Sequence, residues 1–156
     1  MPAVLDLGVG ICLPLAAPST GAHHNFTGEF GLLQPMGDRR TVLGGTTFVG
    51  VDLSGNTRAG LKVRQLTQLR RFVLDIGLGA LLFDSRGGIG ATAHVGVNVK
   101  RRFGLRLSAD VVDRPGGSLA VAYIGGSVAK LSSRLSPIEG IVGAVLPLIM
   151  ILVNII

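Results

Sequence analysis

The stretch Ile89–Lys100, IGATAHVGVNVK, alternates between two kinds of side chain at every position. Its odd-numbered residues are Ile, Ala, Ala, Val, Val and Val, and its even-numbered residues are Gly, Thr, His, Gly, Asn and Lys. Successive side chains of a β-strand point to opposite faces of a sheet, so this pattern predicts a strand with one apolar and one polar face. Phe72–Asp84 and Phe103–Val111 repeat the pattern.

Short segments rich in Gly, Pro, Asn, Asp and Ser separate further stretches of this kind, and these residues favour turns. They are Pro35–Asp38, Ser54–Asn56, Asp84–Gly88 and Asp113–Gly117. We predict eight strands, near Ala3–Leu13, Asn25–Leu33, Thr41–Leu53, Arg58–Thr67, Phe72–Phe83, Ile89–Lys100, Phe103–Val112 and Ser118–Ala129. Because the connections after the first are short, consecutive strands pair, and closing the sheet removes its exposed edges. The predicted fold over residues 1–134 is all-β, an eight-stranded antiparallel up-and-down meander barrel.

The composition is apolar for a chain of 156 residues, with 47% hydrophobic and 15% charged residues. Soluble domains average about 25% charged residues, so a fully solvated globule is disfavoured, and the apolar content disfavours disorder. The single cysteine, Cys12, excludes an intrachain disulfide framework and a cysteine-based metal cluster.

Residues 135–156 form a different segment, because no charged residue occurs from Gly140 to Ile156. The uncharged stretch Gly140–Ile156 is near the lower limit of length for a membrane-spanning helix. We expect a hydrophobic C-terminal tail, helical and buried in a membrane. Packing of the tail on or into the barrel is the alternative.

A barrel made of two-faced strands has two orientations available. A soluble barrel turns its apolar face inward, whereas a membrane barrel turns it outward around a polar lumen. We favour the membrane orientation for three reasons. Most predicted strands reach the roughly 9–11 residues that a tilted membrane strand needs, the polar face is rich in glycine, and its charges are nearly balanced.

Buried charges persist only when they are paired, so we predict a mutually paired network of charges that plugs the lumen. Its predicted members are Asp6, Glu29, Asp52, Lys62, Arg64, Asp75, His94, Arg106 and Asp110. An ordinary solvated surface with the same mixture of residues is the alternative.

Basic groups recur one hairpin apart, at residues 39, 70 and 101, so they fall on alternate turns and share one rim of the barrel. The predicted basic rim consists of Arg39, Arg40, Arg70, Arg71, Lys100, Arg101, Arg102, Lys130 and Arg134. It fits anionic lipid headgroups, or it simply keeps the strand ends in water, which is the interpretation that we favour. The turns carry no aromatic residues for base stacking, which argues against nucleic acid.

Over residues 3–130 the chain resembles the small eight-stranded outer-membrane β-barrels of the OmpA/OmpX-like class. The resemblance rests on the alternating runs Phe72–Phe83, Ile89–Lys100 and Phe103–Val111 and on the short turns between them. It implies an outer membrane of the Gram-negative type and a solid, plugged lumen. The chain departs from the class in having no tryptophan and one tyrosine, where aromatic girdles are expected.

We therefore expect a structural or interaction protein of an outer membrane, with membrane lipids as partners. We expect no enzymatic activity, cofactor or metal, because no nucleophile–base spacing is evident and no acidic residue of the same loop completes a metal site with His23 and His24. Two alternatives remain. One is a narrow pore, although eight strands normally leave no aqueous channel; the other is a soluble lipophile-binding barrel anchored by the tail.

Overall fold

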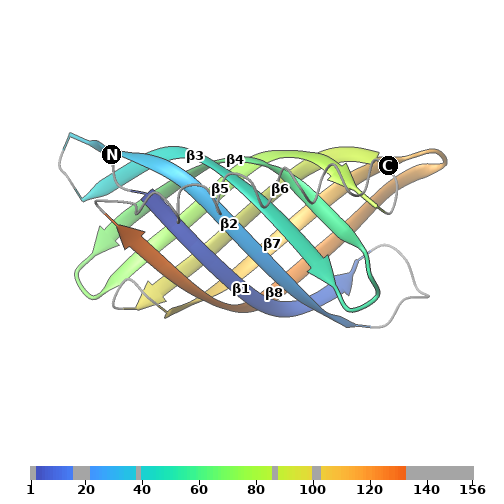
Figure 1. Ribbon diagram of the computed structural model, residues 1–156, viewed down its shortest axis with the longest axis horizontal. Helices are drawn as coiled ribbons and strands as arrows, with labels where there is room; N and C mark the ends of the chain where they lie inside the picture. Colours follow the sequence, from blue (N-terminus) through green and yellow to red (C-terminus); the bar gives the residue numbers. More distant parts are fainter. Residues whose placement is uncertain (1–2, 16–21, 38–39, 86–87, 100–102, 133–156) are drawn as a thin grey trace.

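A computed structural model describes residues 3–15, 22–37, 40–85, 88–99 and 103–132. They form eight strands: β1 (Ala3–Pro14), β2 (His23–Met36), β3 (Thr41–Asp52), β4 (Thr57–Leu69), β5 (Phe72–Asp84), β6 (Gly88–Val99), β7 (Phe103–Arg114) and β8 (Gly117–Ser132). Each strand pairs antiparallel with the next, and β8 pairs with β1, so the sheet closes into a barrel of steeply tilted strands (Figure 1). The predicted eight-stranded meander barrel is confirmed.

The strands begin and end close to their predicted bounds, and β2 shows one informative difference. A turn was predicted from Pro35, but β2 continues to Met36, and Pro35 pairs with Val42 of β3. The described ladder between β1 and β2 ends earlier, at Ala3 and Leu32. Proline has no N–H to donate. Because Pro35 lies beyond the last described pair of β1 and β2, the missing N–H breaks no described pairing between these strands.

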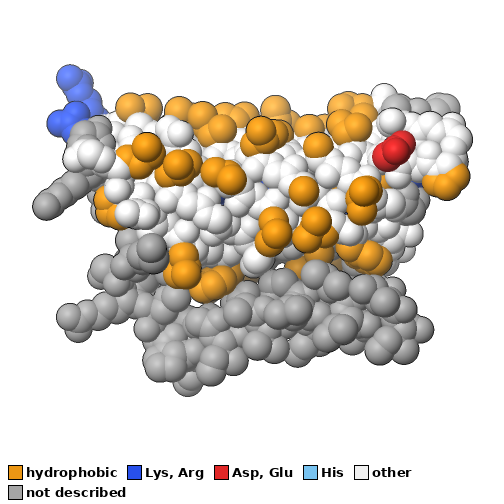
Figure 2. Space-filling view, turned by 90° about the horizontal axis from the view of Figure 1, so that it is seen from above, with side chains coloured by type: hydrophobic (Ala, Val, Ile, Leu, Met, Phe, Trp, Pro, Cys, Tyr) orange, Lys and Arg blue, Asp and Glu red, His pale blue; other side chains and the backbone are white. Residues whose placement is uncertain are grey.

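The barrel wall is apolar outside and polar inside. Leu78 and Leu105 are 67% and 74% exposed, whereas Asp75 and Asp110 are 1% and 0% exposed. Figure 2 shows hydrophobic side chains spread along the visible wall between the two ends of the barrel. The apolar face of the alternating strands is thus the outer face.

The interior is layered along the barrel axis, with apolar side chains near both mouths. One apolar cluster lies toward the mouth formed by the β3–β4, β5–β6 and β7–β8 turns, and it comprises Cys12, Phe48, Leu81, Val112, Leu119, Val121 and Tyr123. The other lies toward the opposite mouth and comprises Val4, Leu33 and Leu66, with Val42 and Val73 packed against it. The charged side chains lie mainly between these two layers.

The predicted helical tail, residues 135–156, and its boundary with the barrel at residue 134 lie outside the described residues. Within the described ranges, no helix has the length and apolar character needed to cross a membrane.

Candidate functional site: a charge network inside the barrel

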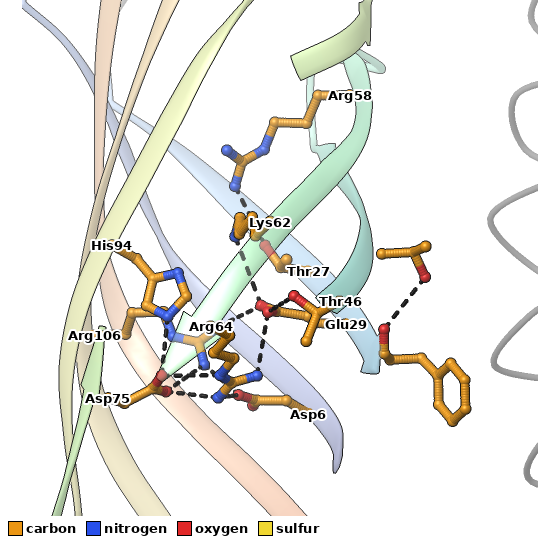
Figure 3. Close-up of polar contacts among 12 residues, drawn as sticks. Asp6, Thr27, Glu29, Thr46, Arg58, Lys62, Arg64, Asp75, His94 and Arg106 are labelled. Atoms are coloured by element: carbon orange, nitrogen blue, oxygen red, sulfur yellow. Dashed lines mark hydrogen bonds and ion pairs between the residues drawn. The ribbon is translucent and has the colours of Figure 1, made fainter. Parts of the chain in front are cut away.

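Arg64 of β4 is the centre of the charged layer, and its side chain is completely buried. Its Nη2 lies 2.6 Å from Oδ2 of Asp6 on β1, and its Nε donates to Oδ1 of Asp75 on β5 at 2.8 Å. Its Nη1 lies 3.2 Å from Oε1 of Glu29 on β2. One planar guanidinium thus joins carboxylates from three other strands (Figure 3), a role that suits the fixed fork of arginine donors.

Arg106 of β7 approaches the same three carboxylates. Its Nη1 donates to Oε2 of Glu29 at 3.1 Å, and its Nη2 donates to Oδ2 of Asp75 at 2.9 Å and also to Oδ2 of Asp6. Asp6, Glu29 and Asp75 are therefore each shared by two guanidiniums. Sharing of this kind compensates the large cost of taking charges out of water.

Three further side chains complete this cluster. Nζ of Lys62 lies 3.6 Å from Oε2 of Glu29, and Oγ1 of Thr46 donates to Oε1 of the same residue at 2.7 Å. Nε2 of His94 lies 3.0 Å from Oδ1 of Asp75. Three carboxylates thus contact three basic side chains and one imidazole, which leaves the described cluster close to electrical neutrality.

Arg58 of β4 and Asp110 of β7 form a second ion pair. It lies nearer the mouth formed by the β3–β4, β5–β6 and β7–β8 turns. The guanidinium of Arg58 also stacks on the ring of Tyr123, 3.7 Å from its centroid, an arrangement favourable to a cation. Arg58 was not predicted as a network member. The signal was present in the sequence, because Arg58 has the same strand parity as Lys62 and Arg64.

Among the predicted network residues, Asp52 is the one whose described contacts are with a turn and not with the other predicted members. Its carboxylate accepts hydrogen bonds from the backbone N–H groups of Ser54 and Asn56 and from the side-chain amide of Asn56, each at 2.9 Å. Aspartate commonly stabilises a turn in this way. The other eight predicted members divide between the Arg64 cluster and, in the case of Asp110, the pair with Arg58.

A small hollow lies beside these charges. A cavity of about 30 Å³ is lined by Arg58, Lys62, Arg106, Tyr123 and small residues of β1 and β8. Such a volume holds about one water molecule.

The basic rim is only partly described. Arg40, Arg70 and Arg71 are exposed at the end of the barrel where β2, β4 and β6 finish, and Figure 2 shows Lys and Arg side chains gathered at that end. The backbone of Lys130 on β8 pairs with Leu5. The remaining predicted rim residues lie outside the described ranges: Arg39, Lys100, Arg101, Arg102 and Arg134.

His23 and His24, the adjacent histidines at which no metal site was expected, occupy the first positions of β2. No group of three or more His, Cys, Asp and Glu residues is placed to hold a metal ion in the part of the chain that the structure describes.

No protein-family model and no curated protein matches the sequence. Among solved structures, a de novo designed transmembrane β-barrel is similar with a TM-score of 0.50 and 12% identity, covering 83% of this chain and 95% of that chain. The attachment invasion locus protein Ail of Yersinia pestis has a TM-score of 0.49 and 8% identity, covering 83% of this chain and 98% of its own. The similarity to the designed barrel shows a shared fold.

Proposed function

We propose that this protein spans an outer membrane as a closed β-barrel and serves there as a structural or interaction protein, without enzymatic activity. The observation that carries the proposal is the apolar wall. Leu78, Leu105 and Ile89 are each at least two-thirds exposed, whereas Asp75 of β5 and Asp110 of β7 are buried inside. Soluble monomers rarely expose apolar surface of this extent, whereas the acyl chains of a bilayer would cover it.

Two features of the backbone support a membrane location. The strands have 12 to 16 residues, and about 9–11 tilted residues suffice to cross the hydrocarbon core. Closure of the sheet pairs the backbone of every strand with two neighbours, as a bilayer requires because it supplies no hydrogen-bonding partners. The shared fold with a designed transmembrane barrel agrees with this location.

The layered interior supports a plugged lumen. Ions crossing the barrel would have to pass the apolar cluster around Val4 and Leu33, the charges around Arg64, and the apolar cluster around Phe48 and Val112. Small barrels of eight strands are generally filled by side chains. A lipophile-binding interior has no support here, because the middle of the described lumen is charged.

The test is to refold the full chain with and without phosphatidylcholine vesicles and to record far-UV circular dichroism and gel filtration. We expect a β-rich protein only in the presence of lipid or detergent. A β-rich monomer in plain buffer would contradict the membrane location.

Planar bilayers then test the lumen, using protein whose insertion has been verified by flotation with the vesicles. We expect no discrete conductance steps, whereas regular steps from inserted protein would replace the plugged barrel with a narrow pore.

A further inference from the structure

The described part of the basic rim contains a hollow beside the β4–β5 turn. An open hollow of about 690 Å³ is lined by Arg40 and by the continuous segment Gln68–Phe72, and an adjoining one of about 550 Å³ shares Arg40, Gln68 and Arg70. The backbone N–H of Gln68 donates to the carbonyl oxygen of Arg40 at 2.8 Å. This hydrogen bond holds the chain before β3 against the end of β4, so two turns build one site.

The lining combines positive charge with apolar surface. Arg40, Arg70 and Arg71 are exposed around the hollow, and no carboxylate is among the described residues that line it. Leu69 and Phe72, about half exposed, flank the same turn and continue the apolar wall up to it. Guanidinium groups match phosphate oxygens in paired, charge-assisted hydrogen bonds. The hollow thus places phosphate-binding groups directly beside a surface suited to acyl chains.

The backbone of Arg70 is an independent indication. Leu69 pairs with Phe72, so Arg70 and Arg71 form a two-residue hairpin loop. Arg70 has a φ of 48°, and every other described residue with positive φ is a glycine. Such loops normally use glycine or asparagine where φ is positive, and retained strain is typical of functional positions. The turn keeps an arginine where glycine would fit the backbone better.

We propose that this hollow binds the phosphate of an anionic glycerophospholipid, with Arg40, Arg70 and Arg71 on the phosphate and an acyl chain along Leu69 and Phe72. The inference rests on the proposed membrane location, because the acyl chain needs a wall that faces lipid.

Native mass spectrometry of the full chain, released from micelles containing equal amounts of phosphatidylglycerol and phosphatidylcholine, tests the site. We expect the natural chain to retain phosphatidylglycerol about tenfold more than phosphatidylcholine. Both lipids carry a phosphate, but the choline ammonium of phosphatidylcholine neutralises its headgroup and would lie beside three guanidiniums, which repel it. The triple variant Arg40→Gln, Arg70→Gln, Arg71→Gln should retain the two lipids equally, and Arg71→Gln alone should show an intermediate preference. Arg114→Gln, which removes an arginine at the other end of the barrel, should keep the full preference.

An unchanged preference in the triple variant, or no preference in the natural chain, would overturn the lipid site. Inorganic phosphate is added in a further arm, and displacement of phosphatidylglycerol at equal concentration would show a site for free phosphate instead. Insertion of the same variants into pure phosphatidylcholine vesicles separates the two proposals. A natural chain that fails to insert contradicts the membrane barrel, whereas one that inserts without lipid preference contradicts only the phosphate site.

Discussion

The guanidinium of Arg64 lies 2.6 Å from the carboxylate of Asp6, although the two residues are 58 positions apart and on strands that are not neighbours in the barrel. The contact therefore crosses the lumen and ties β4 to β1. Burying such charges has a large desolvation cost, which is offset only while each charge keeps its partners. The stability of the barrel should accordingly depend on this contact more than on any single side chain of the wall.

Replacing Arg64 with methionine should lower the free energy of unfolding by about 3–5 kcal/mol, because buried Asp6, Glu29 and Asp75 each lose a cationic partner. Urea unfolding in phosphatidylcholine vesicles, followed by circular dichroism, measures the change without an anionic lipid for Arg71 to bind. The matched control is Arg71→Met at an exposed turn, where a change within about 0.5 kcal/mol is expected. Equal, small losses in both variants would show that the network does not stabilise the fold.

An arginine on the wall should be costly only at the depth of the hydrocarbon core. Leu78, in the middle of β5, and Leu53, in the β3–β4 turn, are both 67% exposed. In vesicles, Leu78→Arg should destabilise the barrel by about 2–4 kcal/mol, and Leu53→Arg by about 0–1 kcal/mol. The same unfolding measurement compares them. Similar small effects at both positions would indicate that water, not lipid, covers the wall.

Gly79 marks a close approach between strands. A Cβ atom added there would lie 1.9 Å from the carbonyl oxygen of Leu61 and 2.6 Å from Cα of Lys62. Gly79→Ala should therefore cost about 1–3 kcal/mol, as overpacking of a filled interior does. Gly45→Ala is the control, because a Cβ at Gly45 meets nothing within 4 Å. The midpoint of thermal unfolding in detergent should fall for Gly79→Ala and stay unchanged for Gly45→Ala; a reversed order would contradict the described packing.

Arg70→Gly should have opposite effects on stability and on lipid retention. Glycine relieves the positive φ of 48° at this position, and relief of a left-handed conformation, less the added chain entropy of glycine, should raise the free energy of unfolding by about 0.5–1 kcal/mol. The same substitution should weaken retention of phosphatidylglycerol, which native mass spectrometry detects. A gain in stability with unaltered lipid retention would leave Arg70 with no role in lipid binding.

The fold could be predicted from the sequence because strand parity is a local property. The alternation in Ile89–Lys100 and its repeats assigns one face of each strand to each side of the sheet, and short turns leave few ways to connect the strands. Closure of the barrel followed from the need to cover two edges.

The site could be predicted only in part, because parity says which face a residue occupies and not how deep in the barrel it lies. Leu33 and Leu81 share the inward face with the charged residues, yet they form the apolar layers near the two mouths. Contacts across the lumen, such as Arg64 with Asp6, depend on the register of several strands together. Parity likewise assigned Asp52 to the lumen network, but Asp52 is the last residue of β3 and its carboxylate stabilises the turn that follows.

The most direct measurement of whether the apolar wall faces lipid uses tryptophan fluorescence, because the chain contains no natural tryptophan. Leu78→Trp should be quenched strongly by phosphatidylcholine brominated deep in its acyl chains and weakly by aqueous acrylamide. Leu53→Trp, equally exposed but at a turn, should show the reverse. A Leu78→Trp variant that acrylamide quenches freely and brominated lipid leaves unchanged would contradict a barrel that spans the membrane.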